Sequence, residues 1–352
     1  MSEHGFGIIG CGMISEFHAQ AIRAIPGARV VAAYDAVPGK AEQLVERHGG
    51  KACRSLAAFL KVPGLEIVTV CTPSGAHAEP AVRSARAGKH LIVEKPLEVT
   101  LRRCDRIIAE CARAGVKLAT VFPSRFAEAS VLAKQAVAAG RFGRLALGSA
   151  YIKWWRTQAY YDSGAWRGTW KLDGGGALMN QSIHAIDLLQ WLMGPVESVV
   201  ARAGCLAHER IEVEDTAAAV LRFASGALGV IEGSTAAFPG QHKRIELCGS
   251  AGSAVLEDEA LRQWQFAEER PEDAEVRARL AEGTQAGGQA DPRAISFAGH
   301  QKQFEDFLRA LETGSAPLVD GPEGRKSVEI ILAIYKSAKI GGRPVKLPLR
   351  AP

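Results

Sequence analysis

Three polar side chains in the middle of the chain could take part in chemistry: Asn180, His184 and Asp187. They are four and three residues apart within an apolar run of helical period, so one helix over residues 172–192 would place them on one face. An amide, an imidazole and a carboxylate can orient a hydroxyl group and exchange a proton with it. The alternative is an ordinary helix whose polar side faces solvent. The glycines at 174–176 would act as a hinge for this helix.

A lysine in the first half of the chain is a second candidate. Lys95 follows the apolar residues 91–93 and precedes Pro96, which restricts the local backbone. A lysine at the end of a strand, partly shielded from water, can have a lowered pKa and act as an acid or a base. A surface lysine paired with Glu94 is an equal alternative on position alone.

A glycine turn near the start of the chain predicts a dinucleotide site. Gly10 and Gly12 begin a GxGxxG-like pattern, with Ser15 in the third position, between an apolar strand and a helical pattern. Gly10 permits the tight turn, and Gly12 allows a pyrophosphate to approach the helix N-terminus. Asp35 ends the next strand, where a carboxylate binds the ribose of NAD and repels the 2′-phosphate of NADP. We therefore expect NAD rather than NADP; a strand-end Asp that begins a turn is the alternative.

Strands and helices alternate as far as residue 122, which predicts an α/β domain with a parallel sheet. In such sheets ligands bind beyond the carboxyl ends of the strands. After this point the pattern becomes rich in strands from residue 145, with closing helices near the end and a long polar surface loop over 268–290. We expect domains at 1–123 and 124–352, a division that suits a chain of 352 residues.

Composition narrows the class of protein. The net charge is +5 with scattered basic residues, so no nucleic-acid partner is expected. We expect neither a secretory signal nor a membrane span, because no apolar stretch approaches twenty residues. Seven cysteines without CxxC spacing favour free thiols in the cytoplasm. His184 and Asp187 alone do not form a metal site, so no metal is expected.

Three segments together resemble the Gfo/Idh/MocA oxidoreductases. They are TPSGAHAEPAVRSARAGKHLIVEKPL at 72–97, GGGALMNQSIHAIDLLQWL at 174–192 and the ending AIYKSAKIGGRPVKLP. The resemblance implies a Rossmann domain followed by an α+β domain with a large, mostly antiparallel open sheet. It also implies a homo-oligomer, a dimer or tetramer, associated through the open sheet face.

The resemblance further implies the roles of individual residues. Lys95 and His184 match the catalytic lysine and histidine, whereas Asn180 stands where the family usually has an aspartate. Because an amide cannot take up a proton, Asn180 is expected to orient a substrate hydroxyl or the nicotinamide. Together with the glycine turn, the resemblance gives the expected cofactor contacts as Gly10, Gly12, Met13, Ile14, Asp35, Thr72, Pro73, His77, Glu94 and Lys95.

An aromatic segment before the glycine triplet is the expected substrate side, with Arg156, Tyr161, Trp166 and Arg167 joining Lys95, Asn180 and His184. The two arginines could bind a carboxylate or phosphate of a uronic acid or nucleotide-linked sugar, or pair with surface acids. We therefore expect an NAD-dependent dehydrogenase or reductase acting on a ring secondary alcohol of a sugar, sugar acid or cyclitol. The alternatives are an NAD-dependent glycosidase that works by transient oxidation, and a non-catalytic sensor of NAD or sugar.

Overall fold

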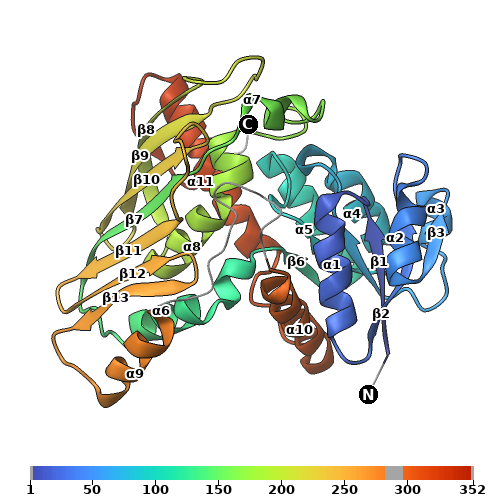
Figure 1. Cartoon of the computed structure of the whole chain (residues 1–352), viewed down its shortest axis with the longest axis horizontal. Helices are drawn as coiled ribbons and strands as arrows, with labels where there is room; N and C mark the ends of the chain where they lie inside the picture. Colours follow the sequence, from blue (N-terminus) through green and yellow to red (C-terminus); the bar gives the residue numbers. More distant parts are fainter. Residues whose placement is uncertain (1–2, 282–295, 350–352) are drawn as a thin grey trace. The chain divides into compact units, whose positions relative to one another are not determined.

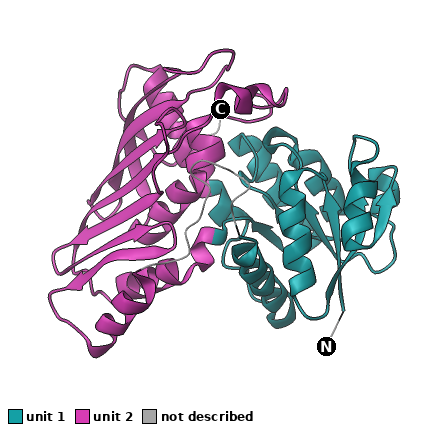
Figure 2. Ribbon diagram, in the orientation of Figure 1, with its two compact units in different colours: residues 1–123, 296–325 teal, residues 124–295, 326–352 magenta. Residues whose placement is uncertain are grey.

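The computed structural model describes residues 3–281 and 296–349, and the chain divides into two compact units (Figure 2). Unit 1 comprises Met1–Pro123 and Ser296–Arg325, and unit 2 comprises Ser124–Ile295 and Lys326–Pro352. The residues at 296–325, which the sequence analysis placed with the second domain, thus belong to the first unit. None of the helices in the described ranges is long and apolar enough to cross a membrane.

Unit 1 is built on a parallel six-stranded sheet in the order β3-β2-β1-β4-β5-β6 (Figure 1). Its strands are β1 (His4–Ile9), β2 (Ala28–Tyr34), β3 (Lys51–Cys53), β4 (Ile67–Val70), β5 (His90–Val93) and β6 (Leu118–Thr120). The strand order reverses between β1 and β4. In open α/β sheets this reversal leaves a crevice beyond the carboxyl ends of the strands, which is where ligands bind. The expected Rossmann domain is confirmed.

Helices cover both faces of this sheet, because right-handed crossovers leave β1 in opposite directions. They are α1 (Met13–Ala24), α2 (Lys40–His48), α3 (Leu56–Phe59), α4 (Ala78–Arg86), α5 (Leu101–Ala114) and α10 (Ala298–Thr313). Helix α10 packs on α1, and its Phe304 stacks on Phe6 of β1 with ring centroids 6.0 Å apart. Phe304 and Phe307 are fully buried in the same apolar cluster as Phe6 and Ile22, which explains why this late segment joins unit 1.

Unit 2 is built on an eight-stranded sheet in the order β13-β12-β11-β7-β10-β9-β8-β14, in which β7 and β10 are parallel and the other neighbours antiparallel. Its strands are β7 (Leu145–Lys153), β8 (Val196–Gly204), β9 (Thr216–Phe223), β10 (Leu228–Ser234), β11 (Arg244–Gly249), β12 (Gly252–Glu257), β13 (Ala260–Phe266) and β14 (Val345–Lys346). The expected large, mostly antiparallel sheet is confirmed; β12 to β14 were not anticipated.

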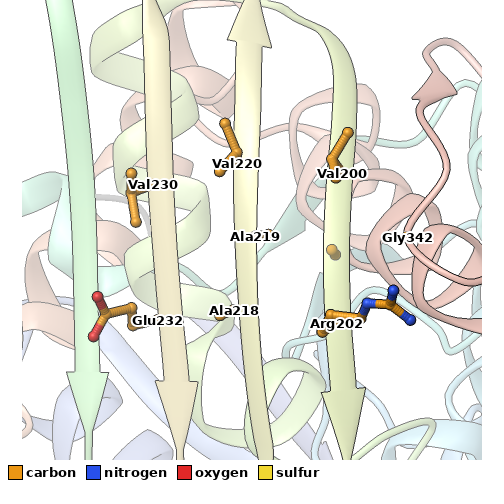
Figure 3. Close-up of a pocket in the computed structure, with 9 residues that line it drawn as sticks. Val200, Arg202, Ala218, Ala219, Val220, Val230, Glu232 and Gly342 are labelled. Atoms are coloured by element: carbon orange, nitrogen blue, oxygen red, sulfur yellow. The ribbon is translucent and has the colours of Figure 1, made fainter.

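One face of this sheet packs against helices and the other is open. The helices of unit 2 are α6 (Glu128–Ala138), α7 (Gln158–Asp162), α8 (Ile183–Met193), α9 (Pro271–Leu280) and α11 (Gly321–Lys339), the last of which begins in unit 1. Helix α8 contacts β7 and β11. On the open face Val200 and Val220 are 40% and 51% exposed. Figure 3 shows that these two side chains line a shallow hollow there, together with Arg202 and Glu232.

The long loop expected over 268–290 is wrong in its first half, because Pro271–Leu280 forms helix α9. Pro271 suits the first turn of a helix, and Asp273 accepts the backbone N–H of Arg270 at 2.8 Å. Asp273 also accepts the indole N–H of Trp264 at 2.8 Å, which fixes the helix to β13. The remainder of the expected loop, from residue 282, lies outside the described residues.

Candidate active site

The glycine turn joins β1 to α1 and leaves the helix N-terminus without a side-chain cap. Gly10 has φ +89°, and a Cβ there would lie 2.7 Å from the backbone of Cys71 and Thr72, so the turn requires glycine. A Cβ on Gly12 would meet nothing within 4 Å. An uncapped helix N-terminus behind an open glycine fits the pyrophosphate of a dinucleotide.

The turn is connected to the end of β2 through Asp35. The Asp35 carboxylate accepts the backbone N–H groups of Cys11 and Val37, each at 2.7 Å. It is therefore held beside the glycine turn, where a cofactor ribose would lie. Met13 and Ile14 form the first turn of α1, with Met13 44% exposed.

The loops after β4 and β5 are joined by a buried histidine. The two ring nitrogens of His77 lie 2.9 Å from the carbonyl oxygens of Thr72 and Pro96. His77 is 1% exposed, so it supports these loops from inside the unit, while Thr72 and Pro73 are half-buried beside it.

Glu94 is also buried. Its Oε1 accepts a hydrogen bond from His18 Nε2 at 2.8 Å, and its Oε2 accepts the backbone N–H of Lys95 at 3.0 Å. Burial alone would raise the pKa of Glu94, but the hydrogen bond from His18 and the imidazole of His300, 3.7 Å from the carboxylate, outweigh it and hold this pKa well below its usual value. Burial lowers the pKa of His18, so a neutral His18 donates to Glu94 while its Nδ1 accepts from the Thr69 hydroxyl at 2.6 Å.

His18, Glu94 and His300 place three possible metal ligands within 4.8 Å of one another. A tetrahedral zinc site separates its ligand atoms by about 3.3 Å. The 2.8 Å distance between His18 and Glu94 is instead that of a hydrogen bond. This cluster therefore fixes the backbone of the half-buried Lys95, which has Glu94 on one side and the His77-bound Pro96 on the other.

In unit 2, the glycine triplet is a place of close packing. A Cβ on Gly175 would lie 2.1 Å from the Tyr335 hydroxyl, and one on Gly176 would lie 1.8 Å from the Glu214 carbonyl oxygen. The Glu214 carboxylate accepts hydrogen bonds from the Gly176 and Leu178 N–H groups and from the Tyr335 hydroxyl, at 3.0, 2.8 and 2.8 Å. These contacts, rather than a hinge, account for the glycines at positions 175 and 176.

The expected helix over 172–192 begins as a π-helical turn, Ala177–Ser182, and continues as α8. Asn180 and His184 are half-buried. Asp187 is 1% exposed and accepts two hydrogen bonds from Arg125, at 2.8 and 2.7 Å, so it is part of a buried ion pair. The expected polar stripe is thus split, because Asp187 faces the interior. A π-helical turn is often found at a functional site.

The substrate-side residues form a connected group in unit 2. Arg156, 3% exposed, donates to the Gln181 side-chain oxygen at 2.9 Å, and Gln181 donates to the Tyr160 hydroxyl at 3.0 Å. The Arg167 guanidinium lies 4.2 Å from the Tyr160 ring centroid and 4.6 Å from that of Trp166. Burial lowers the pKa of Arg156.

The side chain of Tyr161 points away from the face of α7 that carries Tyr160, because adjacent helical residues lie on different faces. Its hydroxyl is 2.8 Å from that of Thr235 and its side chain is buried. Gln181 and Asp173 were not anticipated in the site, whereas Tyr160 begins the aromatic segment expected on the substrate side. The available signal was their position: Gln181 follows Asn180, and Asp173 precedes the glycine triplet.

Comparison with known proteins agrees with this arrangement. A family model described as the oxidoreductase family with an NAD-binding Rossmann fold matches residues 4–122, and the GFO/IDH/MocA C-terminal domain matches residues 131–255. A myo-inositol 2-dehydrogenase of Thermotoga maritima is 30% identical over 97% of this chain and 98% of its own. An inositol 2-dehydrogenase of Rhizobium meliloti is 28% identical, over 94% and 96%.

Among solved structures, the WlbA dehydrogenase from Bordetella pertussis, in complex with NADH and UDP-GlcNAcA, is similar with a TM-score of 0.91. It is 35% identical, and the match covers 99% of each chain. The resemblance noted in the sequence is confirmed by both domain models and by these relatives. The chain belongs to the GFO/IDH/MocA family of NAD-binding oxidoreductases.

Proposed function

We propose that this protein oxidises a ring secondary alcohol of a sugar, sugar acid or cyclitol, or performs the reverse reduction. NAD, when bound, supplies the hydride acceptor. Lys95 takes the hydroxyl proton as the alcohol becomes a ketone, His184 assists this transfer, and Asn180 orients the hydroxyl. The rigid support of the Lys95 backbone by Glu94 is the observation that carries this assignment, because a general base must be held at a fixed position.

The substrate class we favour is a nucleotide-linked sugar acid. Arg156 and Arg167 lie against the same aromatic ring, that of Tyr160, with their guanidinium groups 5.6 and 4.2 Å from its centroid. Within the described ranges Arg167 forms no ion pair with a carboxylate. Two neighbouring guanidinium groups suit a carboxylate or a diphosphate. The similar WlbA dehydrogenase was crystallised with UDP-GlcNAcA, which carries both kinds of anion.

A free cyclitol is the second candidate, because both curated relatives described above are inositol dehydrogenases. NADH formation should be followed with a UDP-linked sugar acid, the corresponding neutral UDP-sugar, a free uronate and myo-inositol. We expect the highest kcat/KM for the UDP-linked sugar acid. Preference for myo-inositol would overturn the anionic class, release of free sugar without NADH would indicate a glycosidase, and binding without turnover would indicate a sensor.

The proposed anion contact has its own variant. Arg167→Leu should raise KM for the UDP-linked sugar acid by roughly 10- to 100-fold and leave KM for NAD unchanged. Arg210→Leu is a matched control, because Arg210 is an exposed arginine of the same unit that pairs with Asp162. An equal rise in KM in both variants would exclude a specific role for Arg167.

We propose NAD as the preferred cofactor because the Asp35 carboxylate would repel the 2′-phosphate of NADP. We also propose that a second copy covers the open face of the unit 2 sheet, where Val200 and Val220 are exposed. Val220→Glu should reduce the molar mass measured by light scattering to that of a monomer. An unchanged mass would exclude this face as the interface.

A further inference from the structure

A buried carboxylate, that of Asp173, lies next to Asn180 and takes no part in the proton transfer proposed above. Asp173 is 2% exposed and directly precedes the glycine triplet. One of its oxygens accepts the backbone N–H of Gly168 at 2.9 Å, and the other accepts a hydrogen bond from the Asn180 side-chain amide. An acidic side chain in the interior of unit 2 is therefore bonded directly to an expected substrate residue.

These contacts determine which way the amide of Asn180 faces. Its nitrogen donates to Asp173, and its oxygen accepts from the Gln181 side-chain nitrogen at 2.9 Å. The reversed amide would set its oxygen against the carboxylate and its nitrogen against the Gln181 amino group. Only the observed orientation satisfies both neighbours, because a carboxylate accepts and cannot donate.

The polar chain continues from Gln181 to a charge of opposite sign. The Gln181 oxygen accepts from Arg156 at 2.9 Å, so a carboxylate and a guanidinium are at the two ends of a path through two amides. Charged ends polarise hydrogen bonds between neutral groups in a region of low dielectric. An asparagine at position 173 could still accept from Gly168, but it would present an amino group to the amino group of Asn180. The negative charge therefore serves Asn180 and not the loop alone.

We propose that Asp173 is the positioning residue of Asn180, and that the two side chains act as one carboxylate–amide unit in the dehydrogenation. This inference rests on the proposed function, in which Asn180 orients the substrate hydroxyl. Burying a carboxylate costs free energy, and its hydrogen bond to Asn180, which orients the reacting hydroxyl, gives that cost a functional reason.

Reciprocal substitutions test the unit. Asp173→Asn should lower kcat by roughly 10- to 100-fold with KM for NAD unchanged, because the substrate hydroxyl is no longer held in one geometry. Asn180→Asp brings two carboxylates into contact and should lower kcat comparably at neutral pH. The double variant Asp173→Asn/Asn180→Asp restores one carboxylate and one amide, and its kcat should exceed that of both single variants.

The controls separate this inference from folding and from the proposed function. Asp162→Asn, an exposed change on α7 of the same unit, should keep the wild-type kcat, and NADH binding with thermal unfolding checks that each variant is folded. A wild-type kcat in Asp173→Asn, or a double variant as slow as the product of the two single effects, would overturn the inference. A wild-type protein that turns over none of the sugars would overturn the proposed function and this inference with it.

Discussion

The Nε2 atom of His18 lies 2.8 Å from the Oε1 atom of Glu94, with both side chains buried in unit 1. His18 belongs to the helix that follows the glycine turn, and Glu94 accepts the backbone N–H of Lys95. Two successive hydrogen bonds through Glu94 therefore connect the helix expected to hold the pyrophosphate with the backbone of the residue expected to take the proton. Glu94 supports both the position of this helix and that of the lysine.

Removing this support should destabilise the protein. His18→Phe retains the ring volume but leaves the Glu94 carboxylate without its 2.8 Å donor. We expect the free energy of unfolding to fall by about 1.5–3 kcal/mol, the usual range for a hydrogen bond to a charged group. Urea denaturation measures this loss. His48→Phe is a matched histidine control, because His48 pairs with the partly exposed Glu16; equal losses in the two variants would contradict the special role of His18.

The same pair should make stability depend on pH. His18 and Glu94 both have folded-state pKa values below their ordinary values of 6.5 and 4.5. The unfolded chain therefore binds more protons as the pH falls, first at the histidine near pH 6.5 and then at the glutamate near pH 4.5, and stability decreases through both ranges. The free energy of unfolding measured from pH 8 downward should show this decline, with the upper part reduced in His18→Phe. Parallel curves for the two proteins would count against it.

The buried ion pair between Arg125 and Asp187 predicts an asymmetric pair of results. Arg125→Met leaves an uncompensated carboxylate in the interior and should cost about 3–5 kcal/mol. The double variant Arg125→Met/Asp187→Leu removes both charges and should recover most of this loss. Chemical denaturation of the wild type, the single variant and the double variant measures these differences in the free energy of unfolding. A double variant as unstable as Arg125→Met would show that packing, not charge, is responsible.

Lys95 should be required for turnover but not for NAD binding. Lys95→Ala removes the proposed base and should lower kcat by roughly 100- to 10,000-fold, the usual contribution of general acid–base catalysis. Its affinity for NADH, measured by fluorescence titration, should stay within a few-fold of the wild type. Lys89→Ala serves as the matched control, since Lys89 lies before β5 and donates to the Leu65 carbonyl. Wild-type turnover in Lys95→Ala would remove the lysine from the mechanism.

Two glycine substitutions should affect different properties, one NAD binding and the other stability. Gly12→Ala adds a methyl group into open space, so thermal stability should be retained while NAD binding weakens, because the cofactor approaches there. Gly176→Ala brings its methyl group within 1.8 Å of the Glu214 carbonyl oxygen and should cost at least 1–3 kcal/mol. Thermal unfolding and NADH titration of both variants test the contrast. Unchanged NADH affinity in Gly12→Ala would place the dinucleotide elsewhere.

Local sequence patterns predicted the helices and strands whose ends are marked by residues close to them in the sequence. Strand β5 and helix α5 begin and end where the sequence indicates, because a continuous apolar run marks the strand and the Thr100 cap and Gly115 mark the ends of the helix. Helix α9 was missed because few apolar residues distinguish its faces, although Pro271 and Asp273 are start signals. The sequence therefore predicted the fold class better than the bounds of weakly amphipathic elements.

The candidate site was only partly predictable. Lys95, Asn180 and His184 follow from local motifs, whereas the partner of Glu94 is 76 residues away in the chain and is brought to it by packing of α1 on the sheet. Asp173 precedes Asn180 by seven residues, and their contact depends on the folded glycine triplet between them. Such pairs are properties of the tertiary structure and leave no periodic trace in the sequence.

The inclusion of α10 in unit 1 has a consequence for how the protein is made. Phe304 and Phe307 complete the apolar cluster around Phe6, so the cofactor unit lacks part of its interior until this helix has left the ribosome. Most of the chain must be translated before the first unit can close, and a fragment ending at residue 123 would expose that cluster to water. During synthesis, unit 1 therefore depends on helix α10, which is translated long after the rest of the unit. A fusion protein that carries residues 1–123 alone would lack this helix.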